Sequence, residues 1–234
     1  MSATTATGGQ VSTCAVAVDV ALLTIREGSL RLLLVEPEPP DLHGCWALPG
    51  RRVRDEESLD DTAHRAIAEL AGVTAAEAHL EQLRTYGDPS RDPRSRVVSV
   101  AYLALTPFTA DPDTGRARLW EVSALDAPDG PRLAYDHDRI VPDALERARS
   151  KLEYTSLATA FVPEEFTLAD LRAVYEAVWG VQLDPANFRR KVVNTPGFVV
   201  PADGVASPGP GGGRPARLYR PGTATRLHPA MLRP

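Results

Sequence analysis

Two apolar runs near the start of the chain have the pattern of paired β-strands. Residues 14–25 (CAVAVDVALLTI) and 31–35 (RLLLV) are rich in valine, leucine and isoleucine, and residues 26–29 (REGS) between them favour a turn. Residues 97–105 (VVSVAYLAL) have a similar composition, and residues 119–122 (LWEV) form a shorter candidate strand. This part of the chain is therefore expected to contain a β-sheet.

A capped helix is expected between these strands. Ser58 is a favourable N-cap, and Asp61 three residues later completes a variant of the capping box. Apolar residues then recur at helical spacing until Gly72 ends the pattern. Residues 140–157 form a second helical stretch, which is expected to connect this part to the rest of the chain. Strands combined with such helices indicate an α+β fold or an α/β sandwich.

The C-terminal part has the pattern of a helix-turn-helix. Thr167 caps a first helix, with Asp170 at its third position, and Gly180 ends it. Asp184 caps a second helix with Pro185 at its first position, where the missing N–H costs nothing. Two short helices joined by a tight turn that contains glycine are typical of this motif.

Two short strands are expected after these helices. Residues 197–200 (GFVV) and 216–219 (ARLY) have strand character, and the Gly- and Pro-rich residues 201–213 between them are expected to form a flexible hairpin tip. A helix-turn-helix followed by a β-hairpin is a winged helix, which is the fold we expect for this part of the chain.

Charge is distributed unevenly along the chain. The net charge is −5, but residues 1–150 carry 16 basic and 24 acidic side chains, whereas residues 151–234 carry 10 basic and 7 acidic. From Ala186 to the end there are eight Arg or Lys residues and one acid, Asp203. Such asymmetry indicates that the chain has two roles, one of which is to bind a polyanion; the alternative is a solvated basic tail.

Composition excludes several classes of protein. The content of 43% apolar and 24% charged residues is ordinary for a soluble globular chain. No run approaches the ~18 apolar residues of a membrane span, and the first ten residues lack the features of a secretory signal. Cys14 and Cys45 match neither a disulfide scaffold nor a close-spaced metal motif. We therefore expect a cytoplasmic protein with no membrane partner.

Residues 48–73 (LPGRRVRDEESLDDTAHRAIAELAGV) resemble the Nudix box. The box reads Gly, five residues, Glu, seven residues, then Arg-Glu-apolar-x-Glu-Glu-x-Gly-apolar. Arg51 stands at the box glycine, and Ala66 and Leu70 stand at two of its glutamates. The positions that match are Glu57, Arg65, Ile67, Glu69, Gly72 and Val73. The resemblance implies a Nudix-like α/β/α sandwich in which the box is degenerate.

The replaced positions bear on metal binding and catalysis. Nudix hydrolases hold Mg²⁺ with their box glutamates, and hard cations of this kind need several convergent oxygen ligands. Positions 66 and 70 lie on one helical face, where a carboxylate pair would clamp the metal. We therefore expect no metal, no required cofactor and no catalytic residue, and we interpret three acids as vestigial: Glu56, Glu57 and Glu69. An active Mg²⁺-dependent Nudix hydrolase of nucleoside diphosphate derivatives such as ADP-ribose stays open as the alternative.

A Nudix sandwich without its metal can still hold a nucleotide diphosphate. Residues 84–96 (RTYGDPSRDPRSR) are similar to the corresponding loop of ADP-ribose-type Nudix proteins. Guanidinium groups bind diphosphate oxygens bidentately, and each arginine below is a candidate for that role, with an ordinary surface arginine as the alternative. The candidates are Arg51, Arg52, Arg84, Arg91, Arg94 and Arg96.

The second helix of the helix-turn-helix carries candidate DNA contacts. A recognition helix places its N-terminal residues against base edges in the major groove, where arginine suits guanine and asparagine suits adenine. Phe188 and Val192 are expected on its core side. The candidate contacts are Asn187, Arg189, Arg190 and Lys191, with Arg214 at the base of the wing expected on phosphate or in the minor groove. A solvated basic helix face is the alternative.

Residues 151–192 and 213–220 resemble the C-terminal domain of the Nudix-related transcriptional regulators, the NrtR family. The stretches EFTL (165–168), NFRRK (187–191) and GRPA (213–216) carry this resemblance, together with Tyr135-Asp136-His137. We expect a Nudix-like sensing domain at residues 11–138, a connecting helix at 139–158 and a winged helix at 159–222. His137 is read as a packed, hydrogen-bonded histidine, with a helix-cap or ligand role as the alternative.

The NrtR resemblance implies a function for the whole chain. Members are homodimeric repressors that bind double-stranded operator DNA and respond to ADP-ribose or a related NAD-derived nucleotide. Many regulate NAD-metabolism genes and some regulate sugar catabolism, so the motifs leave the regulon and the effector open.

Overall fold

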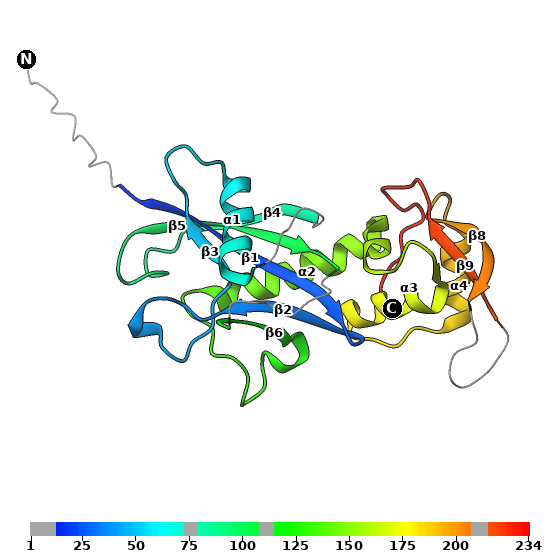
Figure 1. Cartoon of the computed structure of the whole chain (residues 1–234), viewed down its shortest axis with the longest axis horizontal. Helices are drawn as coiled ribbons and strands as arrows, with labels where there is room; N and C mark the ends of the chain where they lie inside the picture. The colour runs from blue at the N-terminus through cyan, green and yellow to red at the C-terminus, as the bar shows by residue number, and fades with distance from the viewer. Residues whose placement is uncertain (1–12, 73–78, 108–114, 207–214) are drawn as a thin grey trace, which may run out of the picture.

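The computed structural model describes residues 13–72, 79–107, 115–206 and 215–234. These residues form two lobes that are joined by a long helix, α2 (His137–Tyr154) (Figure 1). The larger lobe holds a β-sheet and the smaller lobe holds two helices beside a short sheet. No helix in the described ranges is long and apolar enough to cross a membrane.

The large lobe is built on a six-stranded mixed sheet. Its order is β4-β5-β1-β2-β6, with β3 paired to β1, and β1 runs parallel to β5. Glu27 and Gly28 turn β1 into β2 with positive φ angles of 53° and 75°, as a tight two-residue hairpin requires. The strands are β1 (Ala15–Arg26), β2 (Ser29–Val35), β3 (Gly50–Arg52), β4 (His79–Tyr86), β5 (Val97–Leu105) and β6 (Ala117–Glu121).

Helices cover both faces of this sheet, so the expected α/β/α sandwich is confirmed. On one face lies α1 (Leu59–Ala71), which begins at the Ser58 cap and ends at Gly72 in the left-handed conformation. The other face is covered by α2, whose residues Ile140 and Ala144 are buried against the sheet. Short 3₁₀ helices lie in the connections: η1 (Pro40–Leu42), η3 (Val122–Ala124) and η4 (Ser156–Phe161).

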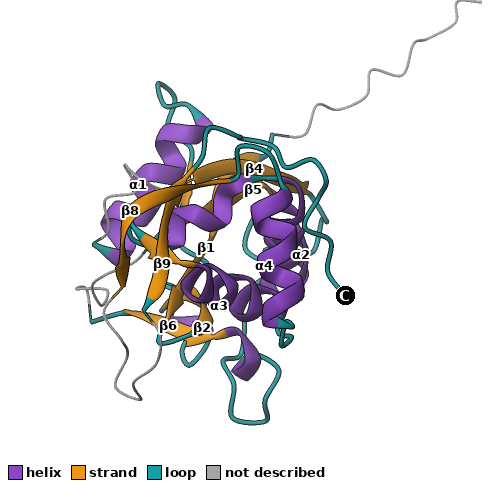
Figure 2. Cartoon of the chain, turned by 90° about the vertical axis from the view of Figure 1, so that its right-hand side faces the viewer, coloured by secondary structure: helices purple, strands orange, loops and turns teal. Residues whose placement is uncertain are grey.

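The small lobe is the expected winged helix (Figure 2). Thr167 and Asp170 form a reciprocal capping box, and Asp184 caps the second helix at the backbone N–H of Asn187. A three-stranded sheet of order β7-β9-β8 lies beside the helices. The elements are β7 (Phe166–Thr167), α3 (Leu168–Trp179), α4 (Pro185–Asn194), β8 (Val199–Ala206) and β9 (Ala216–Pro221).

Several elements differ from the sequence expectation. The connecting helix begins at His137 and ends at Tyr154, three residues earlier at each end than the apolar pattern indicated. It ends at Tyr154 because Thr155 is extended and donates its hydroxyl hydrogen to the Lys151 carbonyl oxygen. Strand β8 continues to Ala206 through residues expected in the hairpin tip, since a register shift between Pro201 and Val205 takes up the extra residues opposite β9. Strands β3, β4 and β7 were not expected at all.

The chain ends on α2 rather than on the wing. The backbone N–H groups of Leu227 and Met231 bond the carbonyl oxygens of Tyr154 and Glu153, and both apolar side chains are buried. Arg233 then pairs with Glu153 at 2.6 Å. Leu227 and Met231 belong to one hydrophobic cluster that also includes core residues of the sheet and of α3. The two lobes therefore share a core.

Candidate functional site

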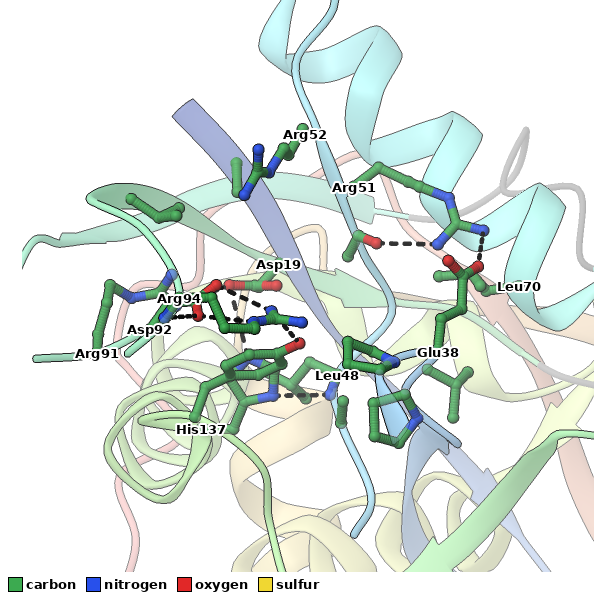
Figure 3. Close-up of a pocket in the computed structure, with 18 of the residues that line it drawn as sticks. Asp19, Glu38, Leu48, Arg51, Arg52, Leu70, Arg91, Asp92, Arg94 and His137 are labelled. Atoms are coloured by element: carbon green, nitrogen blue, oxygen red, sulfur yellow. Dashed lines mark hydrogen bonds and ion pairs between the residues drawn. The ribbon is translucent and has the colours of Figure 1, made fainter. Parts of the chain in front are cut away.

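A cavity of about 460 Å³ opens where β3 pairs with β1 (Figure 3). Its walls come from these two strands, the loop after β2, the end of α1, the loop before β5 and the start of α2. A volume of this size suits a nucleotide-sized ligand. Four of the expected arginines, Arg51, Arg52, Arg91 and Arg94, line it.

The floor of the cavity is a buried ion-pair cluster. The guanidinium of Arg91 is 4% exposed and lies 3.1 Å from Asp19 and 2.9 Å from Asp136. Ser99 donates its hydroxyl hydrogen to the same Asp19 carboxylate. Because both carboxylates hold Arg91 in place, this arginine fixes the shape of the floor.

The Asp19 carboxylate stays ionised. Burial acts to raise its pKa, but the imidazole of His137, the hydroxyl of Ser99 and the guanidinium of Arg91 together lower it to about 2. A Cβ on Gly50 would lie 2.2 Å from Asp19 Oδ1, so the residue opposite on β3 must be glycine. This carboxylate therefore keeps its charge and its position at neutral pH.

His137 is packed and hydrogen-bonded, as expected. Its side chain is 1% exposed, and its Nδ1 accepts the backbone N–H of Leu48 at 2.9 Å. The other ring nitrogen, Nε2, lies 3.6 Å from Asp19 Oδ2. The histidine thus joins the start of α2 to the segment that leads into β3.

A second wall carries a more exposed guanidinium. Arg94 forms two hydrogen bonds of 2.9 Å to Asp92 and one of 2.9 Å to the Tyr135 hydroxyl. Its guanidinium carbon also lies 5.4 Å from the centre of the Tyr135 ring. Asp92 is buried, whereas Arg94 is 39% exposed, so the arginine presents charge at the cavity surface.

The other two candidate arginines lie outside the cavity lining. Arg84 is on β4 and pairs with Asp143 of α2 at 3.1 Å. Arg96 donates to the carbonyl oxygens of Asp88 and Val97. Both side chains therefore have partners within the large lobe and away from the cavity.

Of the three box acids interpreted as vestigial, Glu57 and Glu69 are paired with arginines. Glu57 accepts two hydrogen bonds from Arg65, which with other contacts lower its pKa to about 2. Glu69 accepts one from Arg51 at 2.9 Å, which likewise lowers its pKa. Glu56 is exposed. Val73 of the box lies outside the described residues.

The replaced box positions present apolar groups. Ala66 of α1 is fully buried, and Leu70 of the same helix lines the cavity where a carboxylate would face a metal. Among the residues that the structure describes, no group of three or more His, Cys, Asp or Glu side chains is arranged to hold a metal ion. The residues present therefore do not fit the two-metal site of a Nudix hydrolase.

The second helix of the small lobe presents a basic surface. Phe188 and Val192 are buried, as expected, and the remaining face carries the four exposed candidates Asn187, Arg189, Arg190 and Lys191. The Asn187 amide oxygen accepts from Arg190 at 2.7 Å, and Lys191 Nζ lies 3.4 Å from the Leu232 carbonyl oxygen. Arg214 lies outside the described residues.

Sequence reasoning identified Arg91 of the cavity floor but missed Asp19, Ser99 and Gly50 around it. Asp19 lies within an apolar strand, and a lone carboxylate in such a run is a signal that could have identified it. Ser99 and Gly50 carry no comparable signal, because their roles depend on which strands pair with β1.

Known proteins match both lobes. A NUDIX domain model matches residues 15–144, and a model of the NrtR DNA-binding winged helix domain matches residues 158–220. The "ADPR responsive transcriptional repressor NtrR" of Acinetobacter baylyi is 33% identical over 206 residues, which cover 87% of this chain and 80% of that protein. The chain belongs to the NrtR family.

Other relatives agree with membership of the NrtR family. Shewanella oneidensis NrtR, solved with a 27mer DNA, has a TM-score of 0.73 at 30% identity, covering 88% of this chain and 93% of that one. Its NUDIX domain, solved with ADP ribose, has a TM-score of 0.51 at 32% identity, covering 59% and 90%. An ADP-ribose pyrophosphatase of Methanocaldococcus jannaschii is 32% identical over 127 residues, covering 53% of this chain and 71% of that protein.

Proposed function

We propose that this NrtR-family chain is a transcriptional repressor that responds to ADP-ribose. The observation that carries this proposal is the presence, on one shared core, of a nucleotide-sized cavity and an exposed basic recognition helix. The Acinetobacter and Shewanella relatives support it, because they include an ADPR-responsive repressor and structures with DNA and with ADP ribose. Such a role implies a cytoplasmic location.

The cavity has the chemistry that ADP-ribose requires. Its size suits the ligand, and Arg51, Arg52 and Arg94 offer guanidinium donors to a diphosphate. Tyr135 adds an aromatic ring to the wall. A related NAD-derived nucleotide shares these groups, so the proposal extends to that class.

Operator binding calls for a homodimer. One recognition helix contacts few base pairs, and a two-fold dimer doubles the contact at two half-sites of the DNA. ADP-ribose then regulates the dimer if it binds the DNA-competent and DNA-incompetent arrangements unequally. The connecting helix α2, which packs against both lobes, is the element through which the arrangement would change.

The second candidate function is hydrolysis of ADP-ribose, which the Methanocaldococcus relative favours. We propose that this activity has been lost. Leu70 and Ala66 remove two carboxylates from the box, and the remaining Glu69 is paired with Arg51. No required cofactor belongs to the proposed function.

A mobility-shift titration of the full-length chain on its own upstream DNA tests the proposal. We expect salt-sensitive binding that Arg190→Ala weakens at least about tenfold and that the matched change Arg132→Ala, in the large lobe, leaves intact. ADP-ribose is expected to change the apparent affinity about tenfold or more. DNA binding that is unchanged by Arg190→Ala would overturn the assignment of the recognition helix. Mg²⁺-dependent turnover of ADP-ribose that is abolished by Glu69→Gln would instead support the hydrolase function.

A further inference from the structure

Arg51 occupies the position of the box glycine and lines the cavity, where its guanidinium points toward the carboxylate of Glu38 (Figure 3). Its Nε donates to Glu69 of α1 at 2.9 Å, and one terminal nitrogen donates to the Gly50 carbonyl oxygen at 3.3 Å. These bonds come from rigid elements, a helix and a strand, and they leave the side chain 24% exposed. The guanidinium is therefore held in place before any ligand arrives.

The second terminal nitrogen of Arg51 has a weaker partner. It lies 3.5 Å from a carboxylate oxygen of Glu38, whose side chain is 65% exposed on the loop after β2. Exposed ion pairs of this kind contribute little to stability. Glu38 also lines the cavity, so its carboxylate is an anion that already sits against the cavity arginine.

The four acids that line the cavity, Asp19, Glu36, Glu38 and Asp92, are each paired with an arginine. Leu70 lines the cavity on the side of α1, and the Glu69 carboxylate accepts a hydrogen bond from Arg51. A diphosphate bound here would have its charge balanced by a guanidinium, because the described residues offer no carboxylate cluster for a metal. A fixed guanidinium can form two parallel hydrogen bonds with phosphate oxygens, which a point charge cannot do.

We infer that Arg51 takes the place of the divalent cation at the effector diphosphate, and that Glu38 is an internal anion which the diphosphate displaces. The phosphate oxygens take the place of the Glu38 carboxylate beside the terminal nitrogen of Arg51, while Glu69 keeps the guanidinium oriented. Effector binding is then independent of divalent cations. This inference rests on the proposed function, since it assigns how the same cavity recognises its ligand.

Two carboxylates therefore have opposite effects on the same arginine. Glu69 positions Arg51, so its loss weakens diphosphate binding. Glu38 competes with the diphosphate, so Glu38→Gln strengthens binding. A metal site would give a different result, because the loss of any nearby carboxylate would weaken a metal-dependent complex.

Calorimetric titration of the full-length protein with ADP-ribose tests the inference. We expect equal affinity, within about twofold, in EDTA and in Mg²⁺; a loss of about tenfold or more for Arg51→Ala; and a gain of about threefold for Glu38→Gln. AMP, which lacks the diphosphate, is expected to bind the wild type and Arg51→Ala alike. Arg54→Ala is the matched control, because Arg54 also lies near Glu69, at 3.8 Å, but is 67% exposed and outside the cavity lining.

The outcomes separate this inference from the proposed function. Tenfold tighter binding with Mg²⁺, unchanged binding by Arg51→Ala, or weaker binding by Glu38→Gln would each overturn the role of Arg51 while leaving the ADP-ribose effector in place. Absence of ADP-ribose binding by the wild type under both conditions would overturn the effector itself, and the inference with it. Thermal unfolding of each variant confirms that the comparison is made between folded proteins.

Discussion

Arg91 connects three parts of the large lobe through one buried side chain. Its guanidinium bridges Asp19 of β1 and Asp136 at the start of α2, while its own backbone belongs to the loop before β5. Removing one partner from such a cluster leaves a buried charge uncompensated, which costs more than the pair itself contributes. The ion-pair cluster around Arg91 therefore stabilises the fold as well as forming the floor of the cavity.

The Asp19 carboxylate makes the stability of the protein depend on pH. Its pKa of about 2 lies below the ordinary value of 3.8, so its contribution is fully present above pH 3.8 and is lost as the pH falls towards 2. We expect Asp19→Asn to lower the free energy of unfolding by about 2 kcal/mol at neutral pH and by much less near pH 2. Urea unfolding across this range measures the difference.

The exposed Asp129 provides the control for that experiment. Asp129→Asn is expected to leave the pH profile of unfolding as it is in the wild type, because no buried partner is lost. If Asp19→Asn lowered stability equally at neutral and acidic pH, the charge of Asp19 would not be the source of its contribution.

At the scale of elements, local signals decided which parts of the fold were predictable. Three helices are capped by side chains that accept the backbone N–H three residues later, namely those of Ser58, Thr167 and Asp184. Each of these caps can be predicted from the sequence. Strand β4 has no such signal, because its side chains alternate poorly between buried and exposed. Strands β3 and β7 are too short for a pattern and exist through pairing with β1 and β9.

The capping box of α3 is expected to stabilise the winged helix measurably. Thr167 accepts the Asp170 N–H at 3.2 Å and its own N–H donates to the Asp170 carboxylate at 2.8 Å. Thr167→Ala removes the accepting oxygen and should lower the free energy of unfolding by about 1 kcal/mol. Thr167→Ser keeps that oxygen and is expected to retain most of the stability. Denaturant unfolding compares the two, and equal losses would show that the hydroxyl does not act as the cap.

At the scale of the whole molecule, the candidate site could be predicted only in part. Arginines in the right segments could be identified from the sequence. Only the structure shows that Arg84 pairs with Asp143 outside the cavity lining, whereas Arg91 pairs with Asp136 at the cavity floor. Such pairings depend on contacts between residues distant in the chain, which local patterns do not report. The charge asymmetry could be read from the sequence because it is a property of long stretches of the chain. Under the proposed function, DNA repels the acidic large lobe and the basic helix α4 makes the contact.

The C-terminal tail makes the two lobes depend on each other. Met231 is 2% exposed within the shared core, whereas the adjacent Leu232 is 51% exposed. Met231→Ala is expected to lower the free energy of unfolding by about 2–4 kcal/mol, and Leu232→Ala by less than about 0.5 kcal/mol. Because the core is continuous, calorimetry should show one transition that moves down as a whole. A separate early transition of the winged helix, with the main transition unchanged, would show that the tail stabilises the small lobe alone and does not couple it to the large lobe.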